Sequence, residues 1–204
     1  RGGCEETIRA ACPDMTGRIQ PVPFSMAQRR GLGTKRIESW RASADFAVDA
    51  FNDGAHSVAL ATVGDPAVYS TFTYLRANVE ERLPDVVIAL VPGITAMQAI
   101  AAAAGTPLVE GREILALVPA TVGPEKLGEV LDVVDSVTVY KGGRKMPEVL
   151  EQIRERGRDA IIGTDVSLPT QHLLGLAQVE ADESAPYFST VLSVPERPVT
   201  GGKL

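Results

Sequence analysis

The residues best suited to chemistry in this sequence follow two short apolar runs. Gly64-Asp65-Pro66 comes directly after the run 58–63, and the turn 92–95 comes directly after the run 86–91. Hydroxyl side chains follow the first turn at 69–71, and the second turn ends in a threonine. Such groups suit a small ligand with polar handles, and exposed helix amides favour an anionic group on it. Taken alone, Gly-Asp-Pro is also a common strand-to-helix connection, because these residues dominate turns.

Other groupings that could support catalysis are few. His56 and His172 lie far apart, and no Ser-His-Asp or Cys-His arrangement can be argued from spacing. Neither turn matches a phosphate-binding glycine pattern. Cys4 and Cys12 fit no zinc pattern, so we predict free thiols and no metal site. A cofactor that brings its own reactive group would explain why the chain offers so few reactive side chains.

Composition narrows the class of protein. The 204 residues carry a net charge of −6, which argues against a general nucleic-acid binder. No apolar run approaches the roughly 18 residues that a membrane-spanning helix needs. No secretory signal is recognised at the start, and two free thiols suit a reducing cytoplasm, so we expect a cytoplasmic protein. The two turns favour a small-molecule ligand.

The first half of the chain alternates between expected strands and helices. Steps of three and four between apolar residues predict a helix over 37–51, which Asn52-Asp53-Gly54 would end. A strand at 58–63, a helix from Pro66 to about Leu83, a strand at 86–91 and an alanine-rich helix at 96–104 follow. This alternation implies parallel strands joined by crossover helices.

The second half adds three strands, two helices and a final alternating segment. The expected elements are strands at 113–119, 137–140 and 160–163, helices at 125–134 and 147–156, and a last strand at 187–194. The last strand is expected to be antiparallel and at an edge. We therefore predict an α/β fold in two lobes, with a mainly parallel sheet in residues 1–110 and a mixed sheet in residues 111–204.

An ordered set of short segments resembles the tetrapyrrole methylases. Within that family the set is most similar to the branch that methylates precorrin-2 at carbon 20 in cobalamin biosynthesis. The segments are Pro-Phe-Ser-Met (23–26), Trp40, 64–75 with its Tyr-Ser-Thr, Val-Pro-Gly-Ile-Thr-Ala (91–96), Gly-Thr-Pro-Leu (105–108), 115–121, Val-Tyr-Lys-Gly-Gly-Arg (139–144) and Tyr-Phe-Ser-Thr-Val-Leu (187–192).

The resemblance implies a homodimeric enzyme that transfers a methyl group from S-adenosylmethionine to a carbon of a reduced tetrapyrrole. It also implies a cofactor cleft between the two lobes. The residues that match the family's cofactor site are Gly64, Asp65, Val68, Ser70, Thr71, Thr95, Ala96 and Tyr140. No residue is identified as the base that removes the final proton.

The substrate implied by the resemblance carries eight carboxylates, which arginine and lysine side chains suit. Two basic groups could bind them. The residues are Arg29 and Arg30, with Lys35 and Arg36, and Lys141 and Arg144, with Lys145. The alternative is that both groups are solvated surface charge.

One departure from the family keeps other functions open. The family begins with a strand and a glycine-rich loop, and nothing similar precedes Cys4. We expect that the sequence lacks this segment through truncation or through omission of disordered residues, and the alternative is that the protein has lost it. The alternatives are another acceptor within the family (a different corrin carbon, cobalt-precorrin-2, diphthine or RNA) and a non-catalytic module that binds a tetrapyrrole or a partner.

Overall fold

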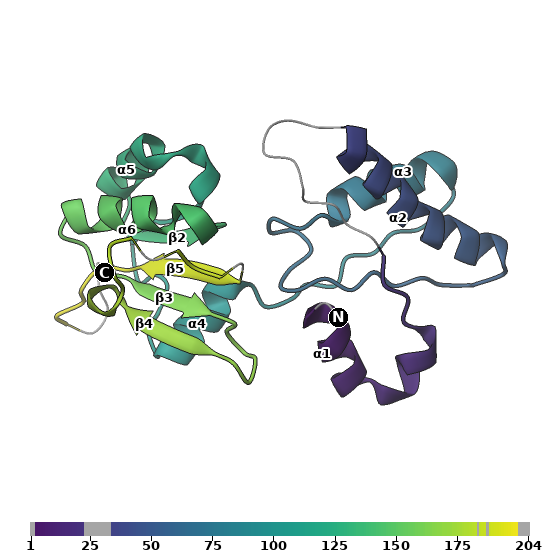
Figure 1. The fold of residues 1–204 in the computed structure, drawn as a ribbon, viewed down its shortest axis with the longest axis horizontal. Helices are drawn as coiled ribbons and strands as arrows, with labels where there is room; N and C mark the ends of the chain where they lie inside the picture. The colour runs from purple at the N-terminus through teal and green to yellow at the C-terminus, as the bar shows by residue number, and fades with distance from the viewer. Residues whose placement is uncertain (1–2, 23–33, 183, 187, 200–204) are drawn as a thin grey trace. The chain divides into compact units, whose positions relative to one another are not determined.

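The computed structural model describes residues 3–22, 34–182, 184–186 and 188–199, which form two compact units (Figure 1). The first unit is Arg1–Gly93 and the second is Ile94–Leu204. Helix α4 (Ala96–Ala104) falls in the second unit, because its Ile100 and Ala101 are buried against Leu192. The division predicted from the sequence, 1–110 and 111–204, differs from these units in the place of α4.

The first unit is helical in its described residues. It contains α1 (Gly3–Ala11), the 3₁₀ turn η1 (Pro13–Arg18), α2 (Thr34–Asn52) and α3 (Phe72–Arg82). Helices α2 and α3 pack through a small core of Ala44, Leu75 and Val79. The rings of Trp40 and Tyr74 stack beside it with centroids 4.0 Å apart.

The helix predicted over 37–51 is confirmed by α2. The predicted stop is also confirmed, because Gly54 adopts a positive φ of 93°, which a glycine adopts without steric cost. No helix in the described part of the chain combines the length and apolarity needed to cross a membrane.

The two strands predicted for the first unit are wrong. Residues 58–63 and 86–91 are assigned to no strand, and the described residues of this unit contain no sheet. A strand is defined by ladder hydrogen bonds to a neighbour, and neither segment makes them. Both segments are apolar and β-branched, but neither has a neighbouring strand to pair with in the described part of the chain.

The second unit is built around a five-stranded mixed sheet with the order β1-β2-β5-β3-β4. Strands β1 and β2 are parallel, and the other pairs are antiparallel. The strands are β1 (Leu115–Pro119), β2 (Ser136–Tyr140), β3 (Ile161–Thr164), β4 (His172–Gly175) and β5 (Ser189–Ser193). The 3₁₀ turns are η2 (Ala120–Val122), η3 (Gly143–Lys145) and η4 (Leu176–Gln178).

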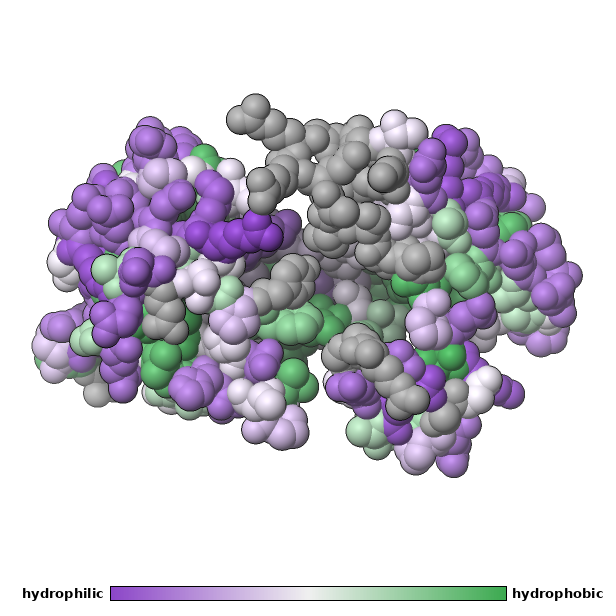
Figure 2. Space-filling view, viewed as in Figure 1, coloured by the Kyte–Doolittle hydropathy of each residue, from purple (hydrophilic) through white to green (hydrophobic). Residues whose placement is uncertain are grey.

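Helices cover both faces of this sheet (Figure 1). Helices α5 (Pro124–Val133) and α6 (Met146–Glu155) bury Leu127, Leu150 and Ile153 on one face, against Val137 of β2. Helix α4 covers the opposite face. The outer surface over α5 is mainly hydrophilic, as Figure 2 shows at the upper left. The core of the second unit therefore lies between the sheet and its amphipathic helices.

The predicted strands and helices of this half are confirmed within a few residues, with two differences. Strand β5 is antiparallel, as expected, but lies between β2 and β3 and is fully buried, not at an edge. Strand β4 was not predicted, because its His-Leu-Leu-Gly sequence has no β-branched residue and no alternation.

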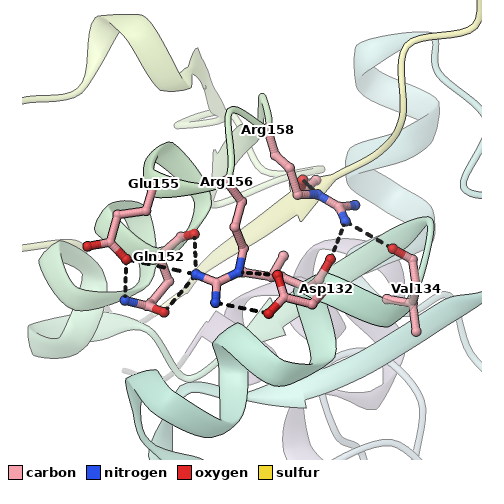
Figure 3. Close-up of polar contacts among 8 residues, drawn as sticks. Asp132, Val134, Gln152, Glu155, Arg156 and Arg158 are labelled. Carbon is pink, nitrogen blue, oxygen red and sulfur yellow. Dashed lines mark hydrogen bonds and ion pairs between the residues drawn. The ribbon is translucent and has the colours of Figure 1, made fainter.

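Two arginines tie the end of α5 to the chain that follows α6 (Figure 3). Arg156 binds both carboxylate oxygens of Asp132, at 2.7 and 3.2 Å. Arg158 donates to the carbonyls of Leu131 and Val134, each at 2.9 Å. These carbonyls belong to the last turn of a helix and lack intrahelical donors, so the guanidinium acts as a cap.

Candidate functional site

The turn Gly64-Asp65-Pro66 is held by its own backbone. Gly64 has a positive φ of 79°, and the amide of Val68 donates to the carbonyl of Asp65 at 3.1 Å. Helix α3 begins only at Phe72, not at Pro66 as predicted from the sequence. The residues between them form consecutive turns, in which Ser70 Oγ accepts a hydrogen bond from the amide of Phe72 at 3.1 Å.

The carboxylate of Asp65 connects this turn to the second one. Its Oδ2 accepts from the amide of Gly93 at 2.9 Å, and its Oδ1 accepts from the amide of Ala67 at 2.7 Å. The bond from Gly93 is the main cause that lowers the pKa of Asp65 below its usual 3.8, and the bond from Ala67 adds to it. The side chain is therefore a charged acceptor at neutral pH.

Only glycine fits at position 93, where the two turns meet. A Cβ built on it would lie 2.2 Å from the carbonyl oxygen of Gly64. That atom belongs to the backbone, so it could not move aside without moving the turn. The two turns predicted to supply a binding site are thus in backbone contact, as expected.

The start of α4 is fixed by a capping box. Thr95 is buried, its Oγ1 accepts from the amide of Gln98 at 3.4 Å, and its amide donates to Gln98 Oε1 at 2.9 Å. The hydroxyl of Tyr140, at the carboxyl end of β2, accepts from the amide of Met97 at 3.2 Å. Burial raises the pKa of Tyr140, and the bonds with Met97 and Thr95 act in the opposite direction.

The structure thus brings the predicted cofactor residues together in two groups. In the first unit, Gly64 and Asp65 lie against Gly93, while Val68, Ser70 and Thr71 follow in the turns before α3. In the second unit, Tyr140 contacts the first turn of α4, which Thr95 and Ala96 begin. Whether these residues contact a ligand stays a prediction.

The structure describes only one of the two basic groups that were predicted to bind substrate. Lys141 and Arg144 are exposed just after β2, and Lys141 has a positive φ of 60°. Their neighbour Lys145 forms an ion pair with Glu148 at 3.6 Å. Arg29 and Arg30 lie outside the described residues, as do the side chains of Lys35 and Arg36.

Sequence reasoning missed the roles of Gly93 and Gln98. The Thr-x-x-Gln spacing is a recognisable capping box, so Gln98 could have been found from the sequence. The need for glycine at 93 has no local signal, because the atom it would strike belongs to Gly64.

Chemically, this arrangement offers backbone turns held by hydrogen bonds, and it offers no reactive side chain among the residues that these turns contain. The oxygens of Asp65 accept from the backbone, and Thr95 is bonded to Gln98. Within the residues that the structure describes, neither turn pairs a nucleophile with a base. The arrangement suits a reaction whose reactive group arrives on a cofactor, which the protein holds in position.

Comparisons with known proteins agree with this interpretation. A family model described as Tetrapyrrole (Corrin/Porphyrin) Methylases matches residues 4–179. A precorrin-2 C(20)-methyltransferase from Sinorhizobium sp is 32% identical over 161 residues, which are 78% of this chain and 64% of that protein. A probable cobalt-precorrin-2 C(20)-methyltransferase from Methanocaldococcus jannaschii is 40% identical over 106 residues, which are 52% of this chain and 43% of that protein.

A solved structure extends the likeness to the fold. The crystal structure of the methyltransferase CobJ is 25% identical with a TM-score of 0.59, and the match covers 93% of this chain and 84% of that one. The chain spans less than two thirds of the length of the two curated relatives. Because the family model matches most of its residues, this chain belongs to the tetrapyrrole (corrin/porphyrin) methylase family.

Proposed function

We propose that this chain acts as an S-adenosylmethionine-dependent C-methyltransferase on a reduced tetrapyrrole, and that its substrate is precorrin-2, methylated at carbon 20. The observation that supports this most directly is the 32% identity over 161 residues to a protein named for that activity. The ordered motifs of residues 23–26, 64–75 and 139–144 support the same branch.

The groups at the two turns fit S-adenosylmethionine, which would supply an electrophilic methyl group on its sulfonium. Candidates in the first unit are Gly64, Val68, Ser70 and Thr71, whose backbone and hydroxyl groups suit a ligand with polar handles. Candidates in the second unit are Thr95, Ala96 and Tyr140 at the start of α4, where the helix dipole favours an anionic group such as a carboxylate.

The task of these residues is to hold and orient. Methyl transfer needs the acceptor carbon roughly 3–3.5 Å from the methyl group and in line with the bond that breaks. Within the first unit the bonds of Asp65 fix a backbone turn, and within the second unit the capping box of Thr95 fixes a helix start. The electron-rich macrocycle needs little further activation, and the base that takes its proton is not assigned.

The cations after β2 would bind the substrate's carboxylates. Lys141 and Arg144 are exposed, and Arg144 offers a planar fork that pairs with two carboxylate oxygens. We expect charge reversal at Arg144 to raise the KM for the tetrapyrrole and to leave the affinity for S-adenosylhomocysteine unchanged. An unchanged KM would contradict this role. Arg29 and Arg30 are proposed for the same role on the sequence alone.

The direct test is methyl transfer in vitro. The chain is incubated with precorrin-2 and S-adenosylmethionine carrying a ¹³C-labelled methyl group, and the product is examined by NMR and mass spectrometry. One labelled methyl on carbon 20 supports the proposal. Label on another carbon would identify a different branch, and transfer only to cobalt-precorrin-2 would assign the metal-loaded substrate.

A non-catalytic module is the second candidate. It is favoured by the first unit, in which the expected strands have no ladder among the described residues. Such a module would bind the tetrapyrrole without transferring label. A homodimer and a cytoplasmic location are proposed from the family resemblance and the sequence, and analytical ultracentrifugation tests the former.

A further inference from the structure

We infer that Asp65 is a positioning residue, which supports ligand binding by joining the turn 64–67 to the turn 92–93. This inference rests on the proposed function, since it concerns how that site is held. It is a role additional to the direct cofactor contact that the family resemblance suggests for this residue.

The first support is that both carboxylate oxygens are engaged by the backbone. One accepts from Ala67 two residues away, and the other accepts from Gly93, which is 28 residues away in sequence. An ionised carboxylate accepts two hydrogen bonds from separate amides, and neither a hydroxyl nor an amide side chain offers two equivalent acceptor oxygens. The residue type therefore matches the connecting role.

The second support comes from the other side of the contact. The space beside Gly93 is so small that an added Cβ would lie 2.2 Å from the carbonyl oxygen of Gly64. The approach of the two turns thus depends on an absent side chain at 93 as well as on a charged one at 65. Two independent features of the chain are fitted to one contact.

The charge state supports the same role. The bonds from Gly93 and Ala67 hold the pKa of Asp65 below its usual value, so the carboxylate stays an acceptor well into the acidic range. Two of its acceptor positions are directed at backbone amides, one in each turn.

The test compares Asp65→Asn with Gly93→Ala in the full 204-residue chain. Asp65→Asn keeps one acceptor oxygen, and Gly93→Ala keeps the carboxylate but forces the turns apart. The matched controls are Asp85→Asn, at an exposed position, and Gly17→Ala, where an added Cβ meets nothing within 4 Å. Circular dichroism checks that each variant is folded.

The first readout is hydrogen exchange at the amide of Gly93, which needs no ligand. We expect Asp65→Asn to speed this exchange by about fivefold or more, because the amide loses its charged acceptor. The controls should leave the exchange rate unchanged. Unaltered exchange in Asp65→Asn would overturn the inference.

The second readout is the Kd of S-adenosylhomocysteine by titration calorimetry. If Asp65 positions the turns, Asp65→Asn and Gly93→Ala weaken binding by similar factors, about tenfold, although Gly93→Ala retains the carboxylate. If Asp65 acts only by contacting the ligand, Asp65→Asn weakens binding while exchange at the amide of Gly93 stays unchanged, and this outcome overturns the inference. Absence of binding by the wild-type chain would instead refute the proposed function, while the exchange readout still decides the role of Asp65.

Discussion

Similar apolar sequences form a buried strand in the second unit and an exposed segment outside any strand in the first. In the second unit, Val137 and Val139 of β2 are fully buried, and their strand pairs with β1 and β5. In the first unit, Val87 and Val91 belong to a similar β-branched run, 86–91, yet they are 92% and 80% exposed. The difference is not in hydrophobicity but in what lies beside each segment.

A strand is stable when neighbours satisfy its amides and helices cover its faces. Strand β2 has both, because α5 and α6 cover the face that Val137 and Val139 present. The run 86–91 has no ladder partner among the described residues and only a small helical core, around Leu75 and Val79, nearby in its unit. The comparison teaches that an apolar run specifies burial only together with its partners.

The largest expected contrast is in stability. Ile153 is fully buried between α6 and the sheet, so Ile153→Ala should lower the free energy of unfolding by about 2–5 kcal/mol. Val87→Ala, at an exposed position, should change it by less than about 0.5 kcal/mol. Urea unfolding followed by circular dichroism measures both.

A comparable loss in the two variants would contradict the contrast. It would mean that Val87 is buried in solution, and therefore that residues 86–91 find a partner there. Increased light scattering with wild-type protein, relieved by Val87→Lys, would identify that partner as another copy of the chain.

The second contrast concerns a buried ion pair that has no equivalent in the described part of the first unit. Arg197 binds the carboxylate of Glu113 with both Nε and Nη2, at 3.0 and 2.6 Å, and the side chains are 11% and 2% exposed. Glu113→Gln should cost about 2–3 kcal/mol, because it removes the nearer charged partner of the guanidinium and leaves only Glu110, at 3.7 Å. Lys126→Ala breaks an exposed pair and should cost less than about 0.5 kcal/mol.

The same pair predicts how stability depends on pH. The hydrogen bond from Arg197 is the main cause that lowers the pKa of Glu113 below its usual 4.5. Its contribution is therefore complete above about pH 4.5 and is lost as the pH falls through the lower folded value. Thermal melts of wild type and Glu113→Gln should converge below pH 4.5, and a constant difference would exclude this pair as the cause.

The fold was predictable where sequence pattern and environment agree. The helix 96–104, predicted from its alanine content and its glycine stop, is confirmed, as are the predicted strands and helices between 113 and 163. The family resemblance is also confirmed. The predictions of strands at 58–63 and 86–91 are wrong, because whether a segment pairs depends on a neighbouring strand that its own sequence does not specify. The predicted edge position of β5 is wrong, because pairing with strands distant in sequence decides which strands lie at the edge of a sheet.

The site was predictable as a set of turns and not as a set of contacts. Composition and spacing identify Gly64-Asp65-Pro66 and Thr95 as turn and cap residues. The bond between Asp65 and Gly93 joins positions with no sequence relation, so only the folded chain reveals it. The hydrogen bond from Met97 to Tyr140 is of the same kind.

A smaller effect is expected where α4 crosses the sheet. A Cβ added to Gly163 of β3 would lie 2.6 Å from Ile100 of α4. Because Ile100 is fully buried, it cannot swing into solvent, and Gly163→Ala should cost about 1–3 kcal/mol. Ile100→Ala removes the Cγ1 atom that the added Cβ would approach, so it should cost less in the Gly163→Ala chain than in the wild-type chain. If the two costs simply add, this contact is not the cause.

The smallest effect compares one tyrosine from each unit. Tyr140→Phe removes the hydroxyl that accepts from the amide of Met97, so it should cost about 1 kcal/mol and loosen the first turn of α4. Tyr74→Phe keeps the ring that stacks on Trp40 and should change stability by less than about 0.5 kcal/mol. Urea unfolding gives both values, and exchange at the Met97 amide locates the first. Equal effects would mean that the hydroxyl of Tyr140 does not hold α4. A larger effect of Tyr140→Phe on S-adenosylhomocysteine affinity than on stability would place that hydroxyl at the cofactor.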